Sequence, residues 1–241
     1  MRLGFFLDAA ARLREAGHPG GVEPAVIAAL AESAGAQTIL MGWTPGSGLF
    51  QERDYRLVRE VVKGDLIFVA PLAAENVDPV VKLHPGGVVL VASGWDGVRS
   101  PRSLTGEVES ADLAGIAAAY HSAGLTVSAL VTPEAAVMKS AARAGLTGVV
   151  LDCSSYGDAR SDADAQATLD KIADAAMAAA KFGLSPAAAR HLSPRNLSPI
   201  AGIRYLEEVY IGQAVIARAL LVGIDRAIAE FAGLLSRAGG A

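Results

Sequence analysis

The chain has 241 residues, of which 52% are hydrophobic and 5% aromatic, and its formal net charge is −4. This charge offers no basic surface to nucleic acid, and no stretch approaches the roughly 20 apolar residues that span a bilayer. The one cysteine, Cys153, excludes an internal disulfide and suits a reducing compartment. With no targeting sequence visible, we expect a cytoplasmic protein with neither nucleic-acid nor membrane partners.

Eight apolar segments predict β-strands, and a helical pattern follows each of them. Three strands, within 31–41, 120–131 and 141–152, are preceded by a helix end, Ala-Gly and a short turn. Glycine adopts the left-handed conformation that ends a helix, and an unalternated apolar run fits a strand buried on both faces. The predicted strands are 2–7, 37–42, 65–70, 87–92, 126–131, 147–152, 185–189 and 207–211, with helices near 22–35, 52–63, 73–83, 107–123, 133–144, 161–183, 194–201 and 213–237.

This alternation predicts a single (β/α)8 TIM barrel, an α/β fold with a parallel eight-stranded core, and one domain over residues 1–241. An open, doubly wound sheet is the alternative. The seventh strand is the weakest prediction, because Pro186 and a run of alanines have low β-propensity. In a barrel the chemistry belongs to the loops after the strands, so the strand ends are where a site is expected.

The clearest candidate is an anion site beside the eighth strand. Gly212 ends that strand directly before a helix, whose N-terminus offers free N–H groups and a positive dipole end to a phosphate. Arg190 and His191 end the seventh strand and can add charge-assisted hydrogen bonds. The alternative is that Gly212 only permits a tight turn. We therefore expect a small phosphorylated ligand as the partner of this site.

Two acids are candidates for proton transfer, Asp8 after the first strand and Asp152 after the sixth. Capping of the next turn is the alternative for Asp8. Cys153 has no base paired with it in the sequence, so a buried, inert thiol is expected. Trp43 and Trp95 also follow strands, and they either cover or stack on a ligand or fill the barrel mouth. Metal-ligand spacing and nucleotide-binding motifs are absent from the sequence, so we expect neither metal nor cofactor.

Four segments carry a family resemblance that extends over about residues 3–237. They are LGFFLDAAARLREAG (3–17), QERDYRLVREVV (51–62), SYGDARSDADAQATLDKIADAAMAAAKFGL (155–184) and IRYLEEVYIGQAVIARALLVGIDRAIAEF (203–231). They resemble the opening strand, second helix, sixth helix and C-terminal end of pyridoxine 5'-phosphate synthase. The resemblance implies a barrel that assembles into homo-octamers. It also implies a reaction that joins a deoxyxylulose phosphate to an amino-ketone phosphate through several proton transfers.

The resemblance also implies where this sequence departs from the family pattern. Asp8 remains from the family's Asn-x-Asp-His, and Arg14 matches an arginine of the first loop. The family's other acid, base and phosphate-contacting positions fall on Gly42, Thr44, Leu49, Phe68, Val150, Arg190 and Gln213. Glycine, phenylalanine and valine cannot move protons, and each positioned acid or base contributes typically about 10²–10⁴-fold to a rate. The resemblance therefore implies a changed reaction and a more apolar barrel interior.

Three functions stay open at this point. The first is a divergent, transferase- or lyase-type enzyme that acts on a small phosphorylated or carbonyl metabolite by condensation, isomerisation or lyase chemistry. Its proton-transfer residues are Asp8, Asp152 and His191, and its ligand-binding residues are Arg14, Arg190, Gly212, Gln213, Trp43 and Thr44. The second is a non-catalytic homologue with a ligand-binding or assembly role. The third is a true synthase with relocated catalytic groups.

Overall fold

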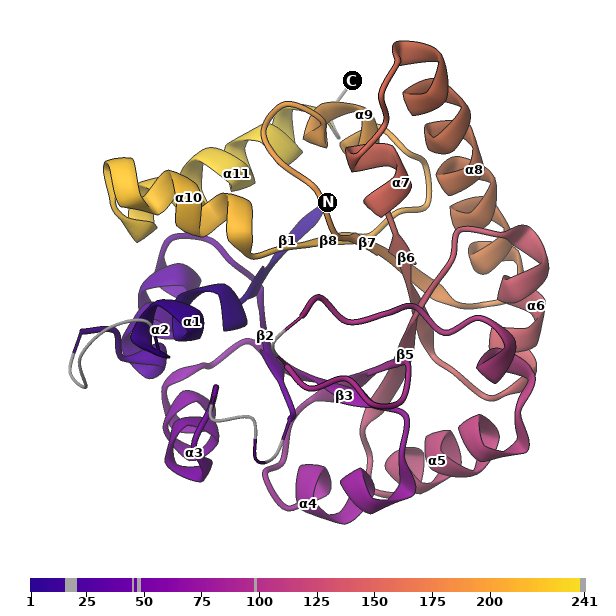
Figure 1. The fold of residues 1–241 in the computed structure, drawn as a ribbon, viewed down its shortest axis with the longest axis horizontal. Helices are drawn as coiled ribbons and strands as arrows, with labels where there is room; N and C mark the ends of the chain where they lie inside the picture. The colour runs from indigo at the N-terminus through magenta and orange to yellow at the C-terminus, as the bar shows by residue number, and fades with distance from the viewer. Residues whose placement is uncertain (16–20, 45, 47–48, 98, 239–241) are drawn as a thin grey trace.

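The computed structural model describes residues 1–241 except 16–20, 45, 47–48, 98 and 239–241. Eight parallel strands form a closed barrel in chain order, and β1 pairs with β8 to close it (Figure 1). The strands are β1 (Arg2–Phe6), β2 (Thr38–Gly42), β3 (Asp65–Pro71), β4 (Gly87–Val91), β5 (Thr126–Val131), β6 (Gly148–Asp152), β7 (Ser185–Ala189) and β8 (Glu208–Ile211). The predicted (β/α)8 barrel is confirmed, and the open-sheet alternative is wrong.

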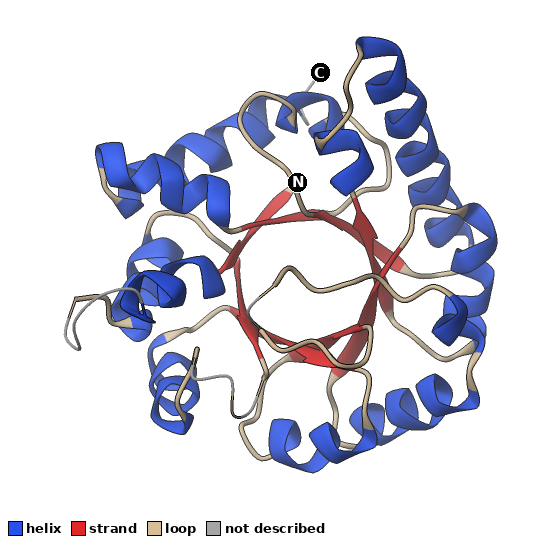
Figure 2. Ribbon diagram, in the orientation of Figure 1, coloured by secondary structure: helices blue, strands red, loops and turns tan. Residues whose placement is uncertain are grey.

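Helices surround the barrel as an outer ring (Figure 2). They are α1 (Asp8–Glu15), α2 (Pro24–Ser33), α3 (Glu52–Val61), α4 (Val77–Val81), α5 (Ala111–Ser122), α6 (Ala135–Arg143), α7 (Ser154–Gly157), α8 (Asp162–Lys181), α9 (Leu197–Ala201), α10 (Gln213–Val222) and α11 (Ile224–Ala238), with 3-10 turns η1 (Ala74–Asn76) and η2 (Gly106–Glu109). The single terminal helix predicted at 213–237 is wrong. The helix is interrupted at Gly223, which separates α10 from α11 and whose φ of +88° favours glycine.

Each strand contributes side chains to two apolar layers, because successive residues face opposite sides of the sheet. One layer lies between the barrel and the helices and holds most of the core. The other lies inside the barrel and is formed by Leu40, Val69, Val89, Val91, Trp95, Leu130, Val150 and Ala187. Even the alanine-rich β7 forms, because it pairs with β6 on one side and β8 on the other. Tertiary pairing thus overrides its low β-propensity.

Phe68 lies on the opposite side of the barrel wall from the one expected. The resemblance assigned it to the interior, but its ring stacks outside on Trp43, with 6.3 Å between ring centroids, and tilts against Tyr55 at 5.2 Å. Its neighbours Ile67 and Val69 face the interior. A shift of one residue along a strand moves a side chain to the other face, which accounts for the error.

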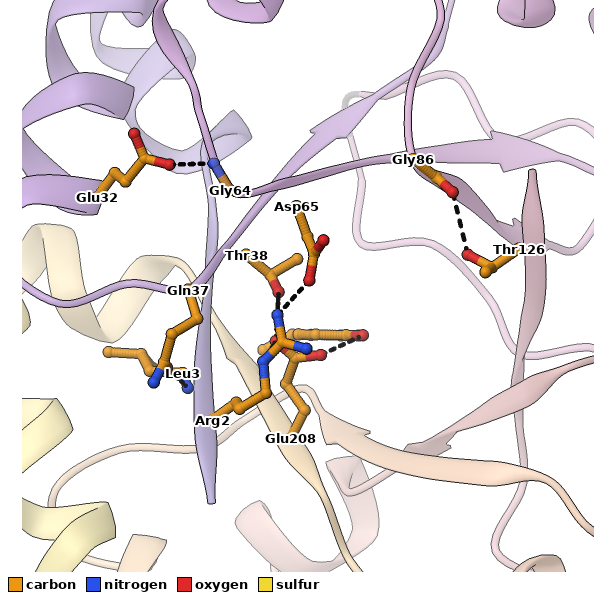
Figure 3. A network of polar contacts seen from close by, with 11 residues as sticks. Arg2, Leu3, Glu32, Gln37, Thr38, Gly64, Asp65, Gly86, Thr126 and Glu208 are labelled. Carbon is orange, nitrogen blue, oxygen red and sulfur yellow. Dashed lines mark hydrogen bonds and ion pairs between the residues drawn. The ribbon is translucent and has the colours of Figure 1, made fainter. Parts of the chain in front are cut away.

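The amino end of the barrel carries a network of polar side chains (Figure 3). Arg2 Nη2 donates a hydrogen bond to Thr38 Oγ1 at 3.1 Å and pairs with Asp65. Thr38 in turn donates to Glu208 Oε1, and Tyr210 Oη donates to Glu208 Oε2 at 3.1 Å. This network borders a cavity of about 270 Å³. Among the described helices, none is long and apolar enough to cross a membrane.

Candidate active site

A second cavity, of about 350 Å³, lies at the carboxyl ends of the strands. Its side chains divide into two groups. The wall from β2 to β6 is apolar, and it consists of Leu40, Val69, Val89, Val91, Leu130 and Val150. The polar side chains come from β1, β7, β8, the segments that follow them and the loop between β4 and α5, and they are Asp8, Arg12, Ser100, Arg190, His191, Ser193, Tyr210 and Gln213. The volume lies in the range of small-molecule sites, so side chains do not fill the barrel mouth.

Asp8 is the buried acid of this cavity. It is the first residue of α1 and 2% exposed, and its Oδ1 accepts a hydrogen bond from Gly42 N at 2.7 Å. Its Oδ2 has no hydrogen-bond partner among the described residues. Burial raises the pKa of Asp8 to about 7, although the Gly42 N–H and the Arg12 guanidinium act in the opposite direction. A carboxyl with this pKa can accept or release a proton near neutral pH.

Gly42 makes room for that carboxyl. A β-carbon at position 42 would overlap Asp8 Oδ2 and lie 2.8 Å from the Trp95 ring. Trp95 packs on the apolar interior cluster, and its Nε1 donates to Arg99 O at 2.7 Å. The absence of a side chain at position 42 therefore lets a buried acid and an indole share the β2 side of the mouth.

Arg190 is the cation held at the cavity by its neighbours. Its Nη1 donates to Pro101 O at 2.5 Å and to Asp152 Oδ2 at 3.1 Å. Its Nε is buried and has no partner in the described part of the chain. Asp152 also accepts hydrogen bonds from Ser103 Oγ and from the Ser154 N–H and hydroxyl. Asp152 is not among the residues that line the cavity, and its contacts make it a positioning group for Arg190.

The N-terminus of α10 faces the same cavity. Gly212 precedes this helix, and Gly212, Gln213 and Ala214 all line the cavity. The φ of Gly212 is −123°, so a left-handed turn is not what requires glycine here. A β-carbon at Gly212 would lie 2.9 Å from Phe6 O, so the close approach of β8 to β1 requires it. Free N–H groups at a helix N-terminus and the positive end of its dipole attract anions.

His191 also borders the cavity. Its Nδ1 lies 2.8 Å from Asp158 Oδ1, and its side chain is 38% exposed. This contact leaves Nε2 as the nitrogen available to a ligand. The structure thus brings together five of the predicted site residues, which are Asp8, Arg190, His191, Gly212 and Gln213.

Three predicted binding residues lie away from the cavity. Arg14 forms a two-pronged ion pair with the buried Asp54, with N–O distances of 2.7 and 2.9 Å. Trp43 packs against Tyr55 and Phe68 outside the barrel wall. Thr44 is buried and is not among the cavity residues. Trp43 and Thr44 follow β2, as a site residue does, and Arg14 lies within α1, but none of the three borders the cavity.

Four polar residues of the cavity, Arg12, Ser100, Ser193 and Tyr210, were not among the predicted site residues. Arg12 lines the cavity from α1, and its Nη2 donates to Gly97 O at 2.5 Å in the segment that crosses the mouth between β4 and α5 (Figure 1). Ser193 enters from the loop after β7. The spacing of Arg12 four residues after Asp8 was an available signal, because residues i and i+4 share one face of a helix.

Cys153 is a buried thiol, as expected, and burial raises its pKa to about 12. A thiol with this pKa is inert as a nucleophile at neutral pH. Across the described ranges, no group of three or more His, Cys, Asp or Glu side chains is placed to hold a metal ion. The polar groups that line the cavity are a carboxyl, an imidazole, two guanidinium groups, two serine hydroxyls, a phenol and an amide.

A family model covers nearly the whole chain. Residues 3–237 match that of the pyridoxal phosphate biosynthesis protein PdxJ. The pyridoxine 5'-phosphate synthase of Synechococcus sp. (strain JA-2-3B'a(2-13)) is 31% identical over 95% of this chain and 96% of its own length. The pyridoxine 5'-phosphate synthase of Syntrophotalea carbinolica is 31% identical over 98% of this chain and 99% of its own length.

Solved structures match at the level of the fold. Phosphoribosylanthranilate isomerase from Thermotoga maritima has a TM-score of 0.60 and 12% identity, covering 98% of this chain and 99% of its own. The tryptophan synthase A-subunit from Pyrococcus furiosus has a TM-score of 0.62 and 11% identity, covering 96% and 97%. At such identities the likeness shows a shared barrel and nothing of the reaction.

Proposed function

The chain belongs to the family of the pyridoxal phosphate biosynthesis protein PdxJ, and we propose that it is a divergent enzyme of this family that acts on a small phosphorylated carbonyl compound. In this proposal Asp8 transfers the proton, and Arg190 and the N-terminus of α10 hold the phosphate. The observation that carries it is the convergence of Asp8, Arg190, His191 and Gly212 on one cavity of about 350 Å³.

The anion site rests on two positive contributions that meet at the cavity. The guanidinium of Arg190 carries a buried Nε that lacks an acceptor among the described residues, and a phosphate oxygen would supply one. The helix N-terminus at Gln213 adds N–H groups and the dipole. Asp152 holds Arg190 through Nη1, which leaves the rest of the guanidinium for the ligand.

The proton transfer rests on the state of Asp8. Because its pKa lies at about 7, both the acid and the base form are populated near neutral pH. The base form would remove a proton from the carbon beside the carbonyl, and the electron pair of that C–H bond would move onto the carbonyl oxygen. Returning the proton to a neighbouring atom gives an isomerisation, and bond cleavage or formation at the same carbon gives lyase or condensation chemistry.

The divergence rests on the opposite wall. Val69, Leu130 and Val150 occupy interior positions of β3, β5 and β6 and line the cavity. None of these side chains exchanges protons. A reaction with several proton transfers would lack partners on this side, whereas a single transfer needs only the Asp8 side. The open cavity also argues against a non-catalytic barrel whose mouth is filled by aromatic side chains.

The proposal is tested by hydrogen–deuterium exchange. We would incubate the full chain in D2O with phosphorylated ketones of three to six carbons, beginning with dihydroxyacetone phosphate, and follow the proton beside the carbonyl by NMR. Protein-dependent exchange with at least one compound is expected, and Asp8→Asn should lower its rate by about 10²–10⁴-fold. Arg190→Gln should raise KM at least tenfold, whereas Arg195→Gln, the same charge change on an exposed residue of the same loop, should not. Exchange that Asp8→Asn leaves undiminished would overturn the assignment.

A second candidate is pyridoxine 5'-phosphate synthase activity itself. The 31% identity to two such synthases over nearly their whole lengths favours it. The test supplies the deoxyxylulose phosphate and the amino-ketone phosphate together and measures pyridoxine 5'-phosphate by its fluorescence. Product above the protein-free background would establish the activity, and none would remove this candidate.

We further propose that the chain assembles into a homo-oligomer, an octamer by analogy with the family. Leu220 and Leu221 at the end of α10 support an interface there, because they are 72% and 78% exposed. Light scattering coupled to size exclusion should give the mass of the assembly. Leu221→Asp should reduce it if this end of the helix lies in an interface.

A further inference from the structure

The two halves of the cavity at the carboxyl end differ in chemistry. All its polar side chains come from β1, β7, β8 and the segments directly after them or from the segment that crosses the mouth. The lining residues of β2 to β6 are six aliphatic side chains, and among these described residues there is no side-chain nitrogen or oxygen. A ligand that fills the cavity therefore has one end among charges and the other against hydrocarbon.

The backbone of that wall cannot make up for the missing polar groups. Its strands pair in parallel with their neighbours along most of the stretch that lines the cavity. Where the pairing of β4 with β5 ends, Val91 O accepts from Leu72 N and Leu130 O accepts from Leu104 N, each at 2.8 Å. These backbone groups already have partners within the protein, so they offer little to a ligand. A ligand hydroxyl placed against this wall would lose its water and gain no partner, which weakens binding by roughly 5- to 150-fold per hydroxyl.

Tyr210 is the phenol that lines the cavity from β8. Its Oη donates to Glu208 Oε2 at 3.1 Å, and Glu208 borders the cavity at the amino end of the barrel instead. The hydroxyl is therefore engaged away from the carboxyl end, and the ring is what Tyr210 offers to a ligand there. A polyhydroxylated ligand finds no partner in Tyr210 either.

We infer that this cavity takes an amphiphilic anion, a phosphate monoester whose short carbon chain is largely free of hydroxyls. The phosphate lies between Arg190 and the N-terminus of α10, and the chain lies against the aliphatic wall of β2 to β6. This inference rests on the proposed function and specifies its substrate class. It sets the chain apart from an enzyme for sugar phosphates, whose hydroxyls need a polar wall.

The test compares two phosphates of equal chain length. Glycerol 3-phosphate is 1-propyl phosphate with two added hydroxyls, and the two differ in nothing else. Their dissociation constants for the full chain would be measured by isothermal titration calorimetry in a phosphate-free buffer. We expect 1-propyl phosphate to bind at least tenfold more tightly. Butyl and pentyl phosphate should each bind roughly fourfold more tightly than the chain one methylene shorter.

A pair of variants tests whether the preference for 1-propyl phosphate over glycerol 3-phosphate depends on the aliphatic wall of β2 to β6. Val89 lines the cavity, and Val88, one residue earlier on β4, faces the helices. Val89→Thr puts a hydroxyl of nearly the same volume into the wall and should reduce the preference for 1-propyl phosphate at least threefold. Val88→Thr makes the same change on the other face, and it should leave the preference unchanged.

The outcomes separate this inference from the proposed function. Glycerol 3-phosphate binding as tightly as 1-propyl phosphate, in a manner that Arg190→Gln weakens, overturns the substrate class and leaves the anion site standing. A preference that Val89→Thr does not alter also overturns the inference, because the wall then does not contact the ligand chain. Failure of both phosphates to bind removes the anion site, and the proposed function and this inference fall together.

Discussion

The barrel has a cavity at each end, and the polar groups at the two ends differ in whether they have hydrogen-bond partners. At the amino end the hydrogen bonds run from Arg2 to Thr38 and from Thr38 to Glu208, so each group has a partner (Figure 3). At the carboxyl end, within the described chain, Asp8 Oδ2 and Arg190 Nε have none. Most buried polar groups in proteins are hydrogen-bonded, so unpaired ones in a cavity indicate a place for a ligand.

The walls of the two cavities also differ in polarity. The cavity at the amino end is lined by hydroxyls of Thr126, Ser128, Thr147 and Ser185, whereas that at the carboxyl end is mostly aliphatic. Satisfied polar groups within a polar wall stabilise the barrel, and unsatisfied groups beside an apolar wall leave charge available to a ligand. In TIM barrels the amino end serves stability and the carboxyl end serves catalysis. The predictions below test whether that division holds here.

The largest expected effect concerns the pH dependence of proton transfer. If the base form of Asp8 removes the proton, the exchange rate should rise with pH and level off above about 7, the pKa of this carboxyl. Asp8→Asn should lower the rate by about 10²–10⁴-fold. Asp65→Asn, at the other end of the barrel, serves as the control and should leave the profile unchanged. A wild-type rate that does not vary between pH 5.5 and 8.5 would contradict the role of Asp8.

The free energy of unfolding should also depend on the protonation of Asp8, but it should fall as pH rises, whereas the exchange rate rises. The pKa of Asp8 is raised in the folded state, so the folded protein binds this proton more tightly than the unfolded chain does. The stability that protonation supplies is present at low pH and is lost as pH rises from about 4 through 7. Asp8→Asn removes this pH dependence. The free energy of unfolding of the variant, relative to that of the wild type, should therefore rise by roughly 2–4 kcal/mol between pH 4 and pH 8. Urea unfolding of both proteins at several pH values measures this change. A difference between variant and wild type that stays the same at every pH would contradict the prediction.

The barrel could be predicted from the sequence because its signal is repeated and local. The apolar runs place every strand to within one residue at each end, as at 185–189, where even a poor strand former is identified by its position in the repeat. The missed elements are short or broken, namely α1, α7 and the division of the last helix at Gly223. One glycine in an amphipathic helix carries little signal, because it is tolerated there at modest cost.

The site could be predicted only in part, because a strand end does not say which way a side chain points. Asp8 and Arg190 follow strands and reach the cavity, and Trp43 follows a strand and does not. The two-residue period of side chains along β2 indicates which side of the barrel wall Trp43 faces. Leu40 and Gly42 face the interior, so Trp43 must face the helices. The contact of Arg12 with Gly97 depends on the course of a long loop, which no local pattern encodes.

At the amino end we expect an effect on stability alone. Glu208 is 9% exposed and accepts hydrogen bonds at both carboxyl oxygens, from Thr38 and from Tyr210. Glu208→Gln replaces one acceptor by an amide that donates, so one buried hydroxyl loses its partner. The free energy of unfolding should fall by about 1–3 kcal/mol. Affinity for 1-propyl phosphate should not change, and a loss of binding would mean that the two ends of the barrel are coupled.

The smallest effect separates the exposed part of that network from its buried part. Arg2 and Asp65 form an ion pair whose side chains are 46% and 55% exposed. Water and salt screen such a pair, so Asp65→Asn should lower the free energy of unfolding by only about 0.2–1 kcal/mol. Raising the salt concentration to about 1 M should remove most of the difference. If Asp65→Asn instead lowered the free energy of unfolding as much as Glu208→Gln does, and independently of salt, the exposed and buried parts of the network would act as one unit. The hydrogen-bonded polar region that distinguishes the amino end would then include its exposed ion pair.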